Sequence, residues 1–293
     1  MPNVATANQF VDALKSMTSN TVITLTADID FNNWLPDAGQ TYPIACPTSQ
    51  TNVSDVIIEG GGHSVYNINN TNSLFSMYLT ATSLGGMRVN HVNFLNCACF
   101  NADKFIFATS GNPAVGQRKL TFYQCTFQGT FNSGFASGRA VYFEKCTFSI
   151  TSNNGNLSYV QSNKTPDYFQ CYFDLKNVRK SITSSILSNL DSCYIQGRVI
   201  IPDDLASSSQ YYNYICRNIG NCCINFELSI PDSVSIALSN VIQHDTASSK
   251  ISVVNTDKIT GASPSVNVNI VAVSDTEMHD AQSLFDKGFE IIV

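Results

Sequence analysis

The stretch FYQCTFQG, residues 122–129, places one cysteine between aromatic residues, and close variants of it recur along the chain. The variants are FLNCAC at 94–99, FEKCTF at 143–148, YFQCYF at 168–173 and LDSCYI at 190–195. Successive cysteines of these phrases are 28, 21, 25 and 22 residues apart. A repeat of this length predicts a repetitive architecture rather than an isolated cysteine site.

The phrases share a pattern: a large apolar residue three places before the cysteine and an apolar residue two places after it. The cysteine and the later residue have the same parity, so they face one side of a strand, whereas the earlier residue needs a bend or a bulge to face the same interior. The pattern predicts an interior ladder that is made of Cys97, Cys125, Cys146, Cys171, Cys193, Phe94, Phe122, Phe143, Phe127, Phe148 and Phe173.

The segments between the phrases are rich in Gly, Asn and Ser, which favour turns. Short strands in turn-rich coils of about 20 to 30 residues are typical of an all-β parallel solenoid. Charged residues make up 13% of the chain, against about 25% in an ordinary soluble domain. Stacked coils explain that scarcity, because like charges placed above one another repel.

The cysteines of the ladder are predicted to be buried thiols, since cysteine is small, apolar and commonly buried. Two alternatives stay open: metal or redox chemistry, and disulfides that form after release into an oxidising medium. Neither Cys97-X-Cys99 nor Cys222–Cys223 has the spacing of a zinc site.

The two ends of the chain have patterns that predict caps. TANQFVDALKSM at 6–17 pairs Thr6 with Gln9 as a capping box, and its apolar residues recur at helical spacing. Near the other end, SVNVNIVAVS at 265–274 alternates like a strand, and Met278, Ala281, Leu284 and Phe285 predict a helix before a last strand FEIIV. We therefore expect an N-terminal capping helix in 1–20, a parallel β-helix in 21–245 and a small strand–helix–strand module in 246–293.

The bulk properties narrow the classes of partner. The net charge of −6 argues against a nucleic-acid partner. No apolar run is long enough for a membrane span, so no membrane insertion is expected. The N-terminus MPNVATANQFVDALKS lacks the features of a secretion signal, which predicts folding in a cytoplasm.

Candidates for chemistry are few, and we predict no catalytic residue, no cofactor and no metal ligand. A hydrolase needs two carboxylates about 5 to 9.5 Å apart. Glu144 and Asp167 on neighbouring coils, accompanied by Arg139 or Arg198, are the nearest approach to such a pair, and solvated surface side chains are the favoured interpretation.

Histidines and tyrosines receive structural or weak binding roles. His63 is expected to make a structural hydrogen bond, and His91 to be a strand residue. Exposed aromatics can stack on sugars. Three tyrosines are therefore weak surface-binding candidates, although they suit a coil or subunit contact equally well: Tyr211, Tyr212 and Tyr214.

The chain resembles right-handed, single-stranded parallel β-helix proteins of the pectate-lyase-like and phage-tailspike type. FVDAL with TVITLTADIDF, the phrase VIIEGGGHSVYNI at 56–68 and the aromatic–cysteine ladder carry this resemblance over residues 6–240. DTEMHDAQSLFDKGFEIIV at 275–293 also looks like the ends of structural proteins in phages of gut Firmicutes.

The resemblance implies a virion structural protein, such as a head fibre or tail-associated appendage, that is assembled in the host cytoplasm. It also implies other virion proteins of the capsid or tail as partners, a homo-oligomer such as a homotrimer, and contact with a host-surface glycan. A glycan-active lyase or hydrolase and a cellular adhesin-like module are the alternatives, and the balance leans away from an enzyme.

Overall fold

The computed structural model describes part of the chain. The described residues are 1–32, 34, 44–45, 54–68, 75–78, 86–97, 107–110, 120–130, 141–155, 167–180, 187–201, 216–220, 223–229, 236–237, 242–243, 249–253, 259–260 and 268–272. They form one short helix and strands that pair in parallel throughout. The prediction of an all-β parallel β-helix is confirmed.

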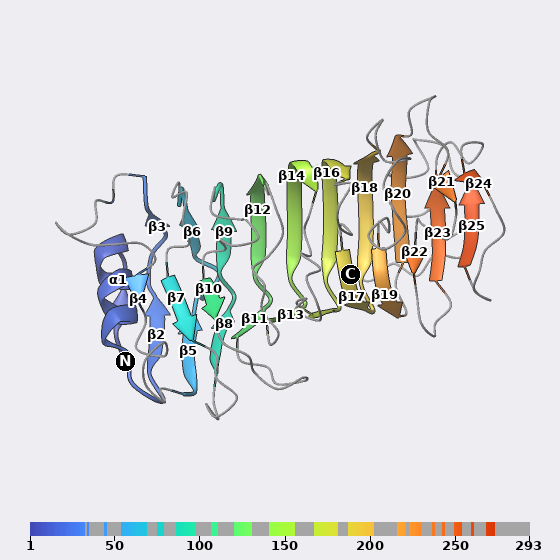
Figure 1. Cartoon of the computed structure of the whole chain (residues 1–293). Coiled ribbons are helices and arrows are strands. Elements are labelled where there is room, and N and C mark those ends of the chain that lie inside the picture. The colour runs from blue at the N-terminus through green and yellow to red at the C-terminus, as the bar shows by residue number, and fades with distance from the viewer. Residues whose placement is uncertain are drawn as a thin grey trace.

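Helix α1 (Ala7–Ser16) covers one end of the solenoid (Figure 1). The Thr6 side chain accepts a hydrogen bond from the Gln9 backbone N–H, and Gln9 Oε1 accepts one from Ala5 N–H. These bonds satisfy N–H groups that lack partners within the helix. Phe10 and Leu14 on the inner face are buried and close the apolar interior at this end.

Two long sheets of ten strands each make up most of the fold. The first long sheet contains, in spatial order, β1 (Asn3–Val4), β2 (Val22–Leu25), β5 (Val56–Glu59), β8 (Met87–Asn90), β11 (Leu120–Tyr123), β13 (Val141–Glu144), β15 (Asp167–Phe169), β17 (Leu187–Asp191), β19 (Cys216–Gly220) and β22 (Ile242–Gln243).

The second long sheet runs beside the first and takes the following strand of each coil. It contains β3 (Ile29–Asp30), β6 (Ser64–Tyr66), β9 (Asn93–Leu95), β12 (Thr126–Thr130), β14 (Thr147–Gly155), β16 (Tyr172–Lys180), β18 (Tyr194–Ile200), β20 (Cys223–Ser229), β23 (Ser249–Val253) and β25 (Val268–Ala272). Figure 1 shows these strands side by side along the molecule.

Two smaller parallel sheets complete the described strands. One consists of β4 (Ile44–Ala45), β7 (Phe75–Tyr78) and β10 (Phe107–Ser110), and the other of β21 (Ile236–Ala237) and β24 (Ile259–Thr260). In the expected C-terminal module, β23 and β25 join the second long sheet in register. The expected helix and last strand lie outside the described residues, and the boundary at 245 stays a prediction.

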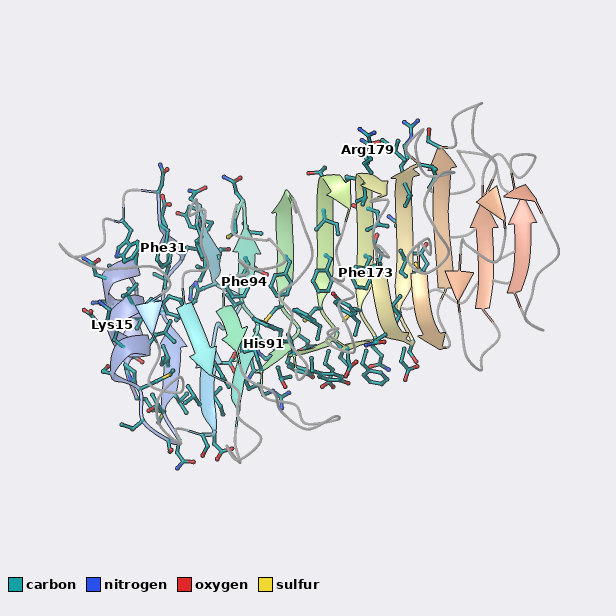
Figure 2. All side chains as sticks on the ribbon, viewed as in Figure 1. Lys15, Phe31, His91, Phe94, Phe173 and Arg179 are labelled. Carbon is teal, nitrogen blue, oxygen red and sulfur yellow. The ribbon has the colours of Figure 1, made fainter. Side chains whose placement is uncertain are left out.

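Aromatic rings fill the interior where the two long sheets meet. Phe122 and Phe143 stack with ring centroids 5.0 Å apart, and Phe148 and Phe173 stack at 4.6 Å. Rings of one sheet meet rings of the other edge to face, as Phe143 and Phe148 do at 5.3 Å. Such stacked and edge-to-face pairs are favourable beyond their apolar burial. Figure 2 shows Phe94 and Phe173 at two points along this interior.

Candidate functional site

The inward positions of the first long sheet hold one continuous apolar row. Parallel register places these residues above one another: Ile23, Ile58, Val89, Phe122, Phe143, Tyr168 and Leu190. The second long sheet has a matching row: Ile29, Val65, Phe94, Phe127, Phe148, Phe173 and Ile195. All of these side chains are at most 2% exposed, so both rows belong to the core.

A bend with left-handed backbone separates the two sheets in each coil of the repeat. Gln124, Lys145, Gln170 and Ser192, each directly before a cysteine, have φ between 49° and 54°. Such φ values are uncommon for residues with a side chain. In each phrase the large apolar residue stands three places before the cysteine, so a regular strand would place the two on opposite faces. The bend lets Phe122 and Cys125 both face inward.

Backbone hydrogen bonds between coils hold the bends in place. Gln124 N–H donates to Glu144 O at 2.9 Å, and Lys145 N–H donates to Phe169 O at 2.9 Å. Each bend therefore rests on the next coil. In the sequence, the left-handed residue of each bend is marked only by a polar side chain before the cysteine. The type of that side chain varies too much to identify the left-handed position in advance.

Four cysteines form a buried column at the inside of these bends: Cys125, Cys146, Cys171 and Cys193. None of the four is in a disulfide, and each thiol contacts a carbonyl of the preceding coil, as Cys146 Sγ does with Phe122 O at 3.4 Å. Burial raises the pKa of the Cys146 thiol well above its ordinary value. A neutral, enclosed thiol suits a packing role and is a poor nucleophile.

The predicted alignment of the first phrase is wrong. Phe94 pairs with Phe127, not with Phe122. Val92 takes the position below Cys125, since Thr126 N–H donates to Val92 O as Thr147 N–H donates to Cys125 O. Cys97 follows a different left-handed residue, Asn96, and its thiol contacts Val65 O at 3.9 Å and Leu95 O at 3.4 Å. Valine fills the same volume without the cysteine that marked the other phrases.

On the outer side of the bends, side chains from three coils form a series of hydrogen bonds. His91 Nδ1 lies 2.7 Å from Glu59 Oε1, and His91 Nε2 lies 2.8 Å from Gln124 Oε1. Asn90 Nδ2 and Gly61 N–H also donate to the Glu59 carboxylate. His91 has φ 52° and lies between β8 and β9, so its predicted place within a strand is wrong.

These contacts shift the pKa values of the pair in opposite directions. Partial burial alone would raise the pKa of Glu59, but hydrogen bonds from His91, Asn90 and Gly61 outweigh burial and lower it. The hydrogen bond to Glu59 raises the pKa of His91. The charged forms of both side chains are therefore favoured together.

Tyr123 lies next to these hydrogen-bonded side chains, between cations of the two neighbouring coils. Arg88 Cζ is 4.7 Å from the centroid of the Tyr123 ring, and Lys145 Nζ is 6.0 Å from it. The His91 ring meets Tyr123 edge to face at 5.6 Å. Arg88 Nε also donates to Asn90 Oδ1 at 2.9 Å. We call Arg88, His91, Tyr123 and Lys145 the corner cluster, and Figure 2 labels His91 just below Phe94.

A second aromatic feature lies on the outer face of the second long sheet. The rings of Tyr172 and Tyr194 stack with centroids 5.5 Å apart and an angle of 2° between them. Burial, the Asp174 carboxylate and Tyr194 raise the pKa of Tyr172 to about 12. Tyr194 is only 5% exposed. This pair is therefore mainly a packing feature.

The remaining sequence candidates do not form a site within the described residues. Glu144 lies opposite Phe169 and Asp167 opposite Tyr142, so the two carboxylates are one strand apart and two positions out of step. Arg198 belongs to the second long sheet. Arg139 and the tyrosines Tyr211, Tyr212 and Tyr214 lie outside the described residues.

His63 lies within ion-pair distance of Asp28, and the structural hydrogen bond that was predicted for it stays a prediction. Its Nδ1 lies 3.4 Å from Asp28 Oδ1, and that carboxylate oxygen also accepts from Ser64 N–H at 2.8 Å. Among the residues that the structure describes, no three His, Cys, Asp or Glu side chains are placed to hold a metal ion together. The one described helix is too short to cross a membrane.

Comparisons with known proteins found a family match over part of the chain and a similar solved structure. The sequence model of a family described as a pectate lyase-like adhesive domain matches residues 1–133, which contain β1 to β12. A solved structure from Bacteroides ovatus, provisionally named an immunoglobulin A1 protease, is 14% identical, with a TM-score of 0.37 over 98% of this chain and 87% of that chain. No curated protein sequence matches the chain.

Proposed function

We propose that this chain is an adhesive β-helix that holds a binding surface on a stiff scaffold and does no chemistry on its ligand. The match of residues 1–133 to an adhesive domain family carries this proposal. The interior rows support it, because stacked apolar residues and coil-to-coil hydrogen bonds resist bending and leave the outer positions free to vary.

The ligand class that suits an adhesive surface of this kind is a glycan. The corner cluster combines aromatic rings and cations, and the Asn90 amide contacts it through Arg88; these are groups that contact sugar rings and their substituents. A lyase or hydrolase on the same scaffold is not favoured, because the matching family is described as adhesive rather than enzymatic.

A narrower form of the proposal places the chain on a virus particle, as a head fibre or tail appendage that contacts the host surface, with homotrimer formation and capsid or tail proteins as partners. It rests on the resemblance of residues 6–240 to phage-tailspike-type β-helix proteins and of residues 275–293 to the ends of phage structural proteins. Mass spectrometry of purified particles, together with images of particles that lack the chain, would test it: fixed stoichiometry and lost density support it, and absence from particles overturns it.

The adhesive function itself is tested with the purified full chain against a panel of capsular and host-surface polysaccharides. We expect saturable binding to at least one polysaccharide by biolayer interferometry. Release of reducing ends or unsaturated sugars from a bound polysaccharide would replace the adhesive proposal with the enzymatic one. Failure to bind any member of a broad panel would contradict the proposal.

A further inference from the structure

Two cations of the corner cluster have no acidic partner among the described residues. Within the part of the chain that the structure describes, Arg88 contacts Asn90 and Tyr123, and Lys145 contacts Tyr123, but no carboxylate lies within salt-bridge distance of either cation. Both side chains are exposed. The chain has few charges and a net charge of −6, and two of its cations lie beside this one aromatic ring.

The fold fixes the spacing of these cations. Arg88 belongs to β8, Tyr123 to β11 and Lys145 to the bend after β13, so three successive coils contribute one group each. Neighbouring parallel strands are about 4.8 Å apart, which puts the coils of Arg88 and Lys145 roughly 10 Å apart. The coils that carry the two cations are therefore two strand spacings apart along the solenoid axis, and both charged groups approach the Tyr123 ring between them, at 4.7 and 6.0 Å from its centroid.

The charges that surround the cluster select against a densely charged ligand. Glu144 and Asp191 occupy the same outward row as Tyr123, and both are solvent-accessible. Glu59 is held by His91 and Asn90. A nucleic acid carries a phosphate at every nucleotide and would meet Glu144 and Asp191. A polymer with widely spaced anions can place them on the cations and avoid these carboxylates.

We infer that the corner cluster binds a linear glycan in which acidic, carboxylate-bearing sugars alternate with neutral sugars, and that the glycan lies along the solenoid axis. Arg88 binds one carboxylate through its terminal nitrogens, since its Nε is engaged by Asn90. Lys145 binds the next carboxylate as a point charge. Tyr123 positions both cations by cation–π contact. This inference rests on the adhesive function and names its ligand class.

The probe is a hyaluronan octasaccharide, in which acidic and neutral sugars alternate, and its reference is the same oligosaccharide with the carboxylates reduced to alcohols. Isothermal titration calorimetry with the full chain should show binding of the acidic form that weakens as salt increases. The carboxyl-reduced form should bind at least about tenfold more weakly. Equal binding of both forms would overturn the inference.

Variants locate the site. Arg88→Gln and Lys145→Gln should each weaken binding about tenfold. Arg179→Gln removes an exposed cation of the second long sheet, which Figure 2 labels at the upper edge of the solenoid, and it should leave affinity unchanged. Glu144→Gln should strengthen binding. Tyr123→Phe keeps the aromatic ring and should bind the acidic oligosaccharide normally. Tyr123→Leu removes the ring that positions the two cations and should bind it more weakly.

The outcomes separate this inference from the adhesive function. Unchanged affinity in both Arg88→Gln and Lys145→Gln, at unchanged thermal stability, would overturn the site and leave adhesion elsewhere on the surface intact. Preference for single-stranded DNA over the oligosaccharide would assign the cluster to nucleic acid and overturn the inference. A chain that binds no glycan of any kind would contradict the adhesive function as well.

Discussion

Adjacent positions of the same strands follow opposite rules in this molecule. The inward row of the first long sheet is uniformly apolar, from Val89 through Phe143 to Leu190. The outward row one residue later changes its chemistry at every coil: Glu59, Asn90, Tyr123, Glu144, Phe169 and Asp191. Repetition inside makes the coils stack, and variation outside gives each coil its own chemistry.

The largest test of this contrast is a pair of neighbouring substitutions, Phe143→Ala inside and Glu144→Ala outside. The Phe143 ring contacts Phe122, Phe127, Phe148 and Tyr168, so its loss leaves a cavity and should cost about 3–5 kcal/mol. Glu144→Ala should stay within about 0.5 kcal/mol. Urea unfolding measures both, and similar losses would contradict the contrast.

Two glycines sharpen the same point at the backbone level. Gly197 has φ 113°, and a Cβ there would overlap the Leu175 backbone in the neighbouring coil. Gly61 has φ 58°, but a Cβ there would meet only the edge of His63 at 4.0 Å. Gly61→Ala should cost about 1–2 kcal/mol for left-handed backbone alone.

Gly197→Ala should cost clearly more than Gly61→Ala, because the backbone of the adjoining coil must also move. Thermal unfolding of the two variants side by side provides the comparison. Equal melting temperatures would show that the coils are not packed as closely as described.

The cysteine column is predicted to tolerate an apolar replacement. Val92 occupies the position below Cys125, so valine already fits in this inward column. Cys125→Val should therefore lower the free energy of unfolding by less than about 1.5 kcal/mol. Glycan binding should not change. Loss of folding, or loss of a metal detected in the purified wild-type chain by elemental analysis, would show that the thiols do more than fill space.

The smallest expected effect is the pH dependence of the Glu59–His91 pair. The pKa of His91 is raised, so its contribution is full below the unfolded value of about 6.5 and is lost as pH rises through the folded value. The pKa of Glu59 is lowered, so its contribution is present above about pH 4.3 and is lost as pH falls through the folded value. The pair therefore stabilises most between roughly pH 4.3 and 6.5.

His91→Gln removes the titrating group and serves as the reference. The melting temperature of the wild type should exceed that of the variant by more at pH 5.5 than at pH 8.5. A difference that stayed constant, or grew at high pH, would mean that His91 is neutral in the folded chain.

Sequence reasoning predicted the inside of this molecule better than its outside. Cys125 and Phe127 share a face because strand side chains alternate, and that rule acts over two residues. Val92 was missed because another apolar residue can fill the same volume. A bend or bulge was expected, but its left-handed residue was not identified because polar residues as different as Gln124 and Lys145 occupy that position.

The corner cluster could not be predicted from short stretches of sequence, because its residues are far apart in the chain. Glu59 and His91 are 32 residues apart in the chain, and the length of the intervening segment sets whether they meet. Arg88 and Lys145 flank Tyr123 only once the register of three coils is known. To predict contacts across coils, every coil between the residues must be aligned correctly. The Cys97 phrase, which was aligned wrongly, adjoins this part of the chain.

Sulfur anomalous scattering from a crystal of the chain tests the central claim most directly, because it locates the cysteines without reference to the rest of the fold. The four sulfurs of Cys125, Cys146, Cys171 and Cys193 should form a line with steps of about one strand spacing, ~4.8 Å, and Cys97 should lie off that line. Sulfurs scattered through the molecule, or joined in pairs at about 2.05 Å, would contradict the stacked coils on which the interior rows and the corner cluster both depend.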